Sequence, residues 1–402
     1  MKKGFTGVAA VLAAALLALT GCQADQAETS AEVYGTGEQT VNGSQESGLG
    51  QNEATGGAQS EPESGKENET AFRAETEESA SAVWEEEIEK GLVARFSVPD
   101  SGREAEILHV IQAEFDVEDL WKMFSSEAGT VEETDDFIGV IYQVKDALGG
   151  DMFWSSGSIS YRSKLGKDIG NMVPRDLITE DPETEKYELE LSGFSRETAR
   201  EQILRRLAEL LPELEVKEAR LYAMTADTLR EYREKLNDPE YYDIYIMKPV
   251  EFRDEWSAEE EVYYFEVSFS LGEDPVRERG FVLPDDTSTR GMYAYGYIGK
   301  NGFEYFTLGE LIFRVEESET QEIISWEQAY QAVKDYFSLI ILDDRHVLTI
   351  DEVKLEYVVM PLWDEDGHAT VFPVWVFSID MEGRPDMKIE YYVNALTGEK
   401  MN

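Results

Sequence analysis

Apolar and polar residues alternate through residues 84–192 in the manner of half-buried strands. The alternating segments are Leu92–Val98, Glu106–Phe115, Phe137–Val144, Met152–Tyr161 and Tyr187–Leu191. Between them, Asp116 precedes apolar residues at helical spacing, which predicts a short capped helix carrying Leu120 and Trp121. We therefore expect residues 84–192 to form one α+β unit.

Two amphipathic helices are predicted in the second half of the chain, and a serine N-cap begins each of them. The first follows Ser195 and the second follows Ser325, which completes a capping box with Gln328. Their apolar faces carry Ala199, Ile203, Leu207, Leu210 and Leu211 in the first, and Ala329, Val333 and Phe337 in the second. Similar spacing predicts similar packing for both helices.

Strands are predicted after each helix, which indicates a degenerate internal repeat. They are Val216–Leu221 and Val262–Phe269 in the first copy, and Ile350–Leu355, Phe372–Ile379 and Ile389–Asn394 in the second. The last strand is followed by a turn over residues 395–399. The alternative is that any two capped helices followed by strands look alike.

The first residues have the order of a secretory signal. Lys2 and Lys3 precede an apolar run, Val8–Leu19, and small residues then lead to Cys22. The Leu-Thr-Gly-Cys ending looks like a bacterial lipobox, and Cys22 is the only cysteine. The alternatives are a signal peptide cleaved elsewhere or an uncleaved anchor helix, for which the run is short. We expect residues 1–21 to be removed and Cys22 to carry lipid on the extracytoplasmic face of the cell membrane.

Residues 22–83 are rich in Gly, Ser, Thr, Glu, Gln and Asn and hold few apolar residues. Such a segment cannot bury enough surface to offset its chain entropy, so we expect a disordered tether. The whole chain has 84 acidic and 36 basic residues, a formal charge of −48. This charge disfavours nucleic acid as a partner.

The search for catalytic and metal-binding residues yields none. The three histidines, His109, His346 and His368, show no ligand spacing, and His109 is expected to pack within a strand. The acidic segment Asp364–His368 fails the spacing of a calcium loop and is predicted to be a turn. No nucleophile elbow occurs. Carboxylates are too abundant for an acidic pair to be singled out, so we predict no catalytic residue, cofactor or metal.

Two groups of residues are candidates for a binding surface. Alternation places Tyr293, Tyr295 and Tyr297 on one strand face, where they would stack on a ligand if exposed. Burial under a helix is the favoured alternative. Arg196 and Arg200 lie on the polar side of the first helix and stand out in an acidic chain, although a solvated helix face is the simpler interpretation.

The C-terminal segment resembles PepSY and PepSY-like domains of secreted bacterial proteins. The residues that carry this resemblance are Ser325–Tyr330, Pro373–Phe377 and Tyr392–Glu399. It covers residues 324–402 well and 194–306 weakly, where the Thr-Gly pair of the final turn is missing. The layout also looks like uncharacterised Gram-positive lipoproteins and the extracytoplasmic regulators of a cell-wall sensor kinase (the YycH/YycI type).

The resemblance implies an α+β fold in which an N-terminal unit precedes two PepSY-like units, each a helix packed on a small antiparallel sheet. The expected boundaries are 84–192, 193–315 and 316–402. It also implies binding or regulation of an envelope protein partner, with no catalytic residues to carry over. The alternatives are a cell-wall glycan hydrolase with an acidic pair and a ligand- or metal-binding module.

Overall fold

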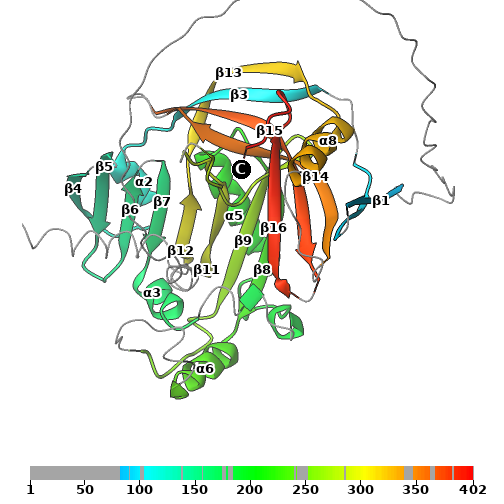
Figure 1. The fold of residues 1–402 in the computed structure, drawn as a ribbon. Helices are drawn as coiled ribbons and strands as arrows, with labels where there is room; N and C mark the ends of the chain where they lie inside the picture. The colour runs from blue at the N-terminus through cyan, green and yellow to red at the C-terminus, as the bar shows by residue number, and fades with distance from the viewer. Residues whose placement is uncertain are drawn as a thin grey trace, which may run out of the picture. The chain divides into compact units, whose positions relative to one another are not determined.

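Sixteen strands join into one sheet in the unit from Ser81 to Asn402 of the computed structural model (Figure 1). The structure describes residues 82–401 except 90, 100–103, 137–138, 156, 174–177, 180–183, 240, 242–251, 285–286, 339–346, 363–366 and 383. The side chains of 135–136, 139 and 384–387 are also outside the described set.

The strands alternate between buried and exposed side chains along most of the sheet. Their bounds are β1 Val83–Glu89, β2 Leu92–Ser97, β3 Glu104–Gln112, β4 Thr130–Asp136, β5 Gly139–Lys145, β6 Asp151–Ser155, β7 Ser158–Arg162, β8 Glu215–Met224, β9 Val262–Leu271, β10 Asp274–Val276, β11 Tyr293–Gly299, β12 Gly302–Gly309, β13 Phe313–Glu322, β14 Leu348–Pro361, β15 His368–Met381 and β16 Arg384–Asn394.

The described residues also form five α-helices and one short 3-10 helix. They are α2 Val117–Lys122, α3 Lys164–Gly170, η1 Thr184–Tyr187, α5 Arg196–Leu210, α6 Ala226–Lys235 and α8 Trp326–Phe337. Ser195 and Ser325 accept hydrogen bonds from the backbone N–H groups of Thr198 and Gln328, so both predicted N-caps are confirmed. The capping box of α8 is also present.

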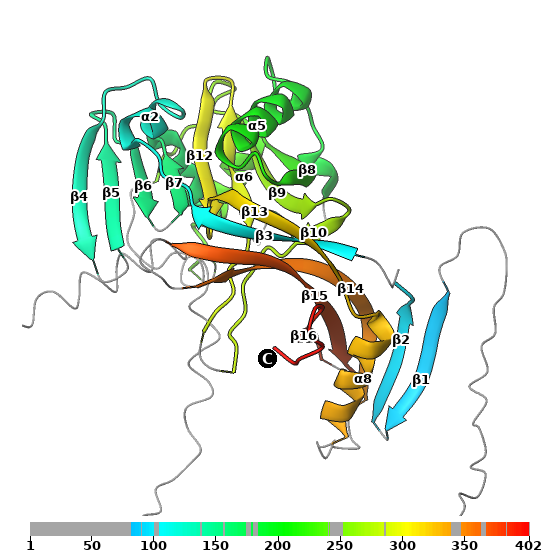
Figure 2. The same cartoon turned by 90° about the horizontal axis from the view of Figure 1, so that it is seen from above.

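The sheet runs in the order β13-β3-β15-β14-β10-β9-β11-β12-β7-β6-β5-β4. Four further strands branch from this path: β2 pairs with β1 and β14, β16 with β15, and β8 with β9. Figure 2 shows that the sheet curls instead of lying in one plane, as expected when twisted strands accumulate.

The predicted fold class is wrong. Strands predicted to form separate small sheets belong to one large curled sheet, so neither PepSY-like unit exists as a helix on its own sheet. The reason is pairing between distant segments: β3 lies between β13 and β15, and β2 runs parallel to β14. Periodicity predicts a strand and its buried face, but it does not specify the neighbouring strand.

Several local predictions also need correction. Tyr187–Leu191, predicted as a strand, holds the end of η1 and a single bridge from Leu191 to Phe194. Met152–Tyr161 is two strands with a turn at Gly157, whose φ is +80°. Among the elements that were not predicted from the sequence are β1, β4, β10, β13, α3 and α6.

The main core lies between the sheet and the two long helices. Ile203 and Leu207 of α5 are buried, as are Ala329 and Val333 of α8. Trp375 of β15 is also fully buried, and its Nε1–H donates to the carbonyl of Ile324 at 3.0 Å. A smaller apolar cluster covers the opposite face of β14–β16 and includes Val358, Val374 and Tyr392.

Carboxylates occupy the edge strands of the sheet. In β13, every residue from Glu316 to Glu322 is exposed, and Glu322 lies directly opposite Glu104 of β3. Like charges opposite each other cost stability. Carboxylates on an edge strand also prevent that edge from pairing with another copy of the same chain. The high acid content therefore has a structural role in solubility.

Candidate functional site

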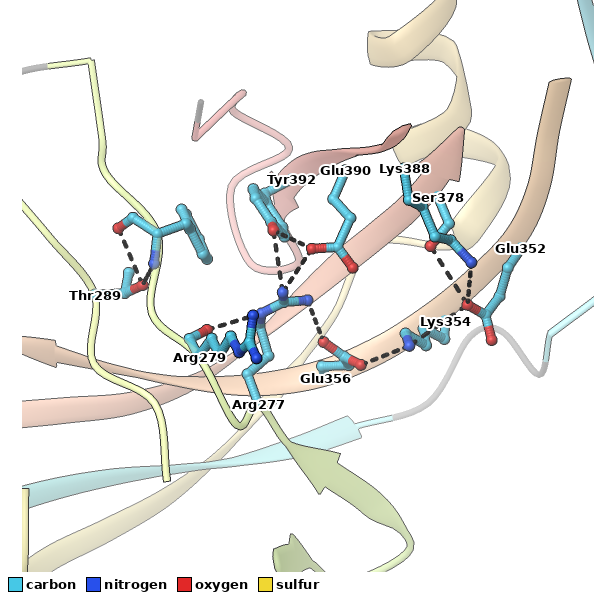
Figure 3. Close-up of polar contacts among 11 residues, drawn as sticks. Arg277, Arg279, Thr289, Glu352, Lys354, Glu356, Ser378, Lys388, Glu390 and Tyr392 are labelled. Atoms are coloured by element: carbon cyan, nitrogen blue, oxygen red, sulfur yellow. Dashed lines mark hydrogen bonds and ion pairs between the residues drawn. The ribbon is translucent and has the colours of Figure 1, made fainter. Parts of the chain in front are cut away.

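A row of charged side chains crosses one face of β14, β15 and β16. Alternation along β14 places Glu352, Lys354 and Glu356 on the same face. Glu390 and Tyr392 reach the same face from β16, and Figure 3 shows them converging with the β14 residues. We call this set, with Arg277, Ser378 and Lys388, the charged row.

Arg277 is the central cation of the charged row (Figure 3). Its guanidinium donates from Nη1 to Glu356 Oε2 at 2.6 Å and from Nη2 to Glu390 Oε2 at 2.7 Å. Nη2 also donates to the Tyr392 hydroxyl at 3.1 Å. Only 11% of the Arg277 side chain and 9% of the Glu356 side chain are exposed. One planar guanidinium thus bridges two carboxylates from the two strands, β14 and β16, that flank β15.

The segment that follows β10 holds Arg277 over the sheet. The Arg277 backbone N–H donates to Tyr357 O at 2.9 Å, and the Arg290 N–H donates to Val359 O at 2.7 Å. Between these anchors, the Phe281 ring stacks on Tyr392 with centroids 3.8 Å apart. The aromatic stack shields the ion pairs from water, which strengthens them.

Glu390 is held in its ionised form by its neighbours in the charged row. Burial by itself raises the pKa of Glu390, but the hydrogen bond from Tyr392 and the charge of Arg277 outweigh burial and lower the pKa. Burial likewise lowers the pKa of Lys354, yet Glu356 and Glu352 raise it overall. Because Glu390 keeps a low pKa beside Arg277, it is poorly suited to act as a general acid.

Two shallow hollows lie beside β14, next to the charged row. The larger, about 540 Å³, is lined by Ser97, Val98, Pro99, Asp351, Glu352, Val353 and Lys388. The smaller, about 320 Å³, shares Pro99 and Val353 and adds Lys217, Glu273, Asp274, Pro275, Lys354, Leu355 and Trp375. Together they follow the β14 backbone from Asp351 to Leu355.

The hollows lie where β14 changes its strand neighbour. Residues 348–350 pair with β2, and Tyr357 pairs with β10, both in parallel. Within the described residues, no strand pairs with this edge of β14 between Ile350 and Tyr357. We call this opening the β14 slot.

The backbone groups that point into the β14 slot are those of Val353 and Leu355. In an antiparallel pair, alternate residues bond to the partner strand and the others point away. Tyr357 and Val359 direct their carbonyls away from β15, toward Arg277 and Arg290, so the odd-numbered residues of this stretch point outward. No described residue bonds the outward groups of Val353 or Leu355. The slot therefore offers two N–H donors and two carbonyl acceptors.

Asp351 lies at the β2 end of the slot, at a bulge in β14. Its Oδ1 is buried and has no hydrogen-bond partner among the described residues, and Lys388 Nζ lies 3.7 Å from Oδ2. Burial raises the pKa of Asp351, and the neighbouring Asp380 raises it further. One oxygen of this carboxylate therefore lacks a partner among the described residues.

Replacing Asp351 with Asn is expected to make the protein more stable at neutral pH. Because the pKa of Asp351 is raised in the folded protein, the protonated side chain stabilises the fold. This contribution to the free energy of unfolding is lost as pH rises through the pKa of the folded state. The amide of the Asp351→Asn variant is neutral at every pH, so the variant does not lose this stability at pH 7. The stability difference between the variant and the parent protein should disappear below the pKa of an ordinary Asp side chain. Denaturant unfolding of both proteins at pH 7 and pH 4 checks this, and a gain of equal size at both values would contradict it.

The predicted tyrosine surface is largely a packed cluster. Tyr297 is 3% exposed, and Tyr293 and Tyr295 are half-buried. The Tyr295 and Tyr305 hydroxyls lie 3.4 Å apart, and the Tyr297 hydroxyl donates to Val173 O at 3.5 Å. Tyr297 is therefore a core residue. For this tyrosine, the structure agrees with burial, which was the alternative to an exposed binding face.

The two predicted surface arginines bind backbone carbonyls of their own chain. Arg196 Nη2 donates to Tyr187 O at 3.0 Å and to Leu189 O at 3.1 Å, and Nη1 donates to Leu221 O. Arg200 Nη2 donates to Ala219 O at 2.9 Å. These bonds fasten α5 to η1 and β8. The arginines act as packing residues here and do not approach the charged row.

Other predicted residues lie apart from the site or outside the described residues. His109 is in β3, with Nε2 3.6 Å from Glu319, and His368 Nε2 lies 3.3 Å from Glu316. Cys22, His346 and Asp364–Asp366 are outside the described residues. In the described part of the chain, no three His, Cys, Asp or Glu side chains gather as a metal site.

None of the helices among the described residues is long and apolar enough to cross a bilayer.

Comparison with known proteins adds information on the fold alone. No protein-family model matches this chain, and no curated protein sequence matches it. Among solved structures, it is similar to an uncharacterized protein from Eubacterium rectale ATCC 33656. The two share 14% identity and a TM-score of 0.50 over 80% of this chain and 93% of that one. The shared architecture is the large sheet and not a PepSY unit.

Proposed function

We propose that this chain is a non-enzymatic binding protein of the cell envelope that holds a protein partner at the β14 slot. The observation that supports this most is the pair of outward backbone groups on Val353 and Leu355, beside two hollows. Exposed sheet edges bind extended polypeptide by adding it as a strand. The ion pairs of Glu356 and Glu390 with Arg277 favour recognition over acid–base chemistry.

The envelope location rests on the lipobox-like sequence before Cys22, which is outside the described residues. Replacing Cys22 with Ala is expected to abolish labelling by radioactive palmitate and release the protein from the membrane fraction. A variant that keeps Cys22 but changes Gln23 to Ala is the control. Equal membrane retention of both variants would contradict lipid anchoring.

Partner binding is tested by placing a photo-crosslinking residue at Ser97, an exposed position on the rim of the larger hollow. In producing cells, we expect one protein to crosslink from Ser97 and not from Glu133, an exposed position on β4. The same protein should be lost when the slot is altered by Asp351→Asn and Glu352→Gln. Crosslinks that are absent, or identical from both positions, would count against the proposal.

A hydrolase is the second candidate, because Asp351 has a raised pKa beside Asp380 at the larger hollow. Glycosidases use a pair of carboxyl groups, and the pKa of the general acid is raised. If this function holds, the purified protein releases soluble sugars from cell-wall glycan, and Asp351→Asn abolishes the release. No release at any pH from 4 to 8 would eliminate this candidate.

A further inference from the structure

We propose that the partner segment bound in the β14 slot is a short extended peptide in which basic and apolar side chains alternate. This inference rests on the proposed function and goes further by naming the chemistry of the segment. It depends on the backbone groups of β14, the two faces that an added strand would meet, and the carboxylates at one end of the slot.

The length of the slot limits the added strand. The opening extends from Ile350, the last residue paired with β2, to Tyr357, which pairs with β10. At about 3.3 Å per residue, that edge is roughly 20 Å long and admits an added strand of about four to six residues. The outward N–H and C=O groups of Val353 and Leu355 would fix such a strand through up to four hydrogen bonds.

The two faces of β14 give the added strand two different environments. Val353 and Leu355 point to the main core and are 5% and 4% exposed, and Trp375 lies beside Leu355. Glu352 and Lys354 point to the opposite, charged face. Because the side chains of a strand alternate between faces, a ligand strand would place apolar residues against the first face and charged residues against the second.

The charge at the β2 end of the slot favours a basic side chain. Asp351, Glu352 and Asp380 meet there, and among the described residues the lysines that oppose them are Lys388 and Lys354. Lys388 Nζ lies 3.7 Å from Asp351 and 3.9 Å from Glu352, and Lys354 Nζ lies 3.5 Å from Glu352. Asp351 Oδ1 is buried and accepts no hydrogen bond there. The Asp351 side chain is 34% exposed, so an ammonium or guanidinium group of a ligand would pair with the accessible part of this carboxylate.

The charge of the whole chain supports the same choice of partner. A formal charge of −48 attracts cationic segments over long distances and repels a second copy of this chain. The carboxylates at the slot would also repel the acidic β13 edge of a second copy, which carries Glu316, Glu317, Glu319 and Glu322. Self-association through the slot is therefore disfavoured, and a basic strand from another protein fits.

The test measures binding of a labelled six-residue peptide, Lys-Val-Lys-Val-Lys-Val with blocked ends, to the purified full-length protein by fluorescence anisotropy. We expect saturable binding, with protection of the Val353 and Leu355 amides from hydrogen exchange. Two comparison peptides isolate the interactions. Lys-Pro-Lys-Pro-Lys-Pro keeps the charge but lacks half of the N–H donors, and Glu-Val-Glu-Val-Glu-Val reverses the charge. Both should bind at least roughly tenfold more weakly.

Protein variants separate slot recognition from general charge attraction. Asp351→Asn with Glu352→Gln should weaken binding of the lysine–valine peptide roughly tenfold, whereas Glu132→Gln with Glu133→Gln on β4 should leave it unchanged. Equal binding of the Lys-Pro peptide, equal effects of the two double variants, or peptide-induced dimers would overturn the inference. Partner crosslinking from Ser97 without peptide binding would refute this inference and leave the proposed function standing.

Discussion

Replacing Arg277 with Met is expected to destabilise the protein by about 3–5 kcal/mol at pH 7, the cost of leaving buried carboxylates without their cation. Glu356 and Glu390 both bind this guanidinium, at 2.6 and 2.7 Å, and Glu356 also pairs with Lys354 Nζ at 2.9 Å. Met fills much of the same space, so the loss reports on charge more than on packing. Denaturant unfolding at equilibrium measures it.

The pH dependence of this loss has a definite sign. In the parent protein, Glu390 has a lowered pKa, so its stabilising contribution exists above its unfolded pKa and disappears as pH falls through the folded pKa. In the Arg277→Met variant, protonation relieves Glu390 and Glu356, which have lost the guanidinium. The difference between the two proteins should therefore shrink from pH 7 to pH 4.

Two further variants test whether the loss of stability in Arg277→Met comes from the buried ion pairs. Arg220→Met breaks an exposed pair with Glu218, whose side chains are 59% and 51% exposed, and should cost less than about 1 kcal/mol. Adding Glu356→Gln and Glu390→Gln to Arg277→Met should recover part of the lost stability, because the two side chains that lost the guanidinium are then neutral. A loss for Arg277→Met as small as that for Arg220→Met would contradict the role of the charged row.

A chain that begins at Gly193 is expected not to fold cooperatively. It lacks β3, which pairs with both β13 and β15, and β7, which pairs with β12. Its core also loses aromatic contacts across the two halves, such as Phe96 with Trp326 and Phe124 with Phe306, with centroids 5.5 and 4.8 Å apart. Exposed apolar faces and new strand edges should lead to aggregation.

The matched control for this truncation is a chain that begins at Ser81 and keeps every described strand. It should unfold in one transition, with coincident near-ultraviolet and far-ultraviolet circular dichroism. The boundaries predicted at residues 192/193 and 315/316 stay predictions until this comparison is made. Cooperative unfolding of the chain that begins at Gly193 would contradict a sheet completed by strands from both halves.

Helix termini could be predicted from the sequence because their signals are local. Ser195 and Ser325 each bond a backbone N–H three residues later, and the spacing of Ile203 and Val333 marks buried faces. The final turn is local too. The Asn394 side chain accepts from the backbone of Leu396 and Thr397, and Gly398 has a φ of +76°.

Strand partners could not be predicted, because pairing depends on residues far apart in the chain. β13 lacks alternation, since its residues from Glu316 onward are exposed on both faces, and it was missed. The run of carboxylates Glu85–Glu87 carries no alternating apolar signal of a strand. They lie in β1, where Glu86 turns inward to Lys334 Nζ at 2.6 Å. That ion pair exists only once the sheet has formed.

The candidate site was also missed, for a related reason. Nothing in the sequence around Arg277 indicates that its partners are Glu356 and Glu390, because they come from different strands. The β14 slot could not be predicted from the sequence either, because its two ends are the points where β2 and β10 stop pairing with β14. The tyrosine alternation did predict a common face, and burial, the favoured alternative, holds for Tyr297.

The most direct test of an open β14 slot is amide hydrogen exchange of the free protein, resolved residue by residue. We predict fast exchange at Val353 and Leu355 and slow exchange at Lys354 and Glu356, which point to β15, with Val359 as a protected outward residue. Uniform protection from Glu352 to Tyr357 would show that this edge is already occupied and would contradict the account.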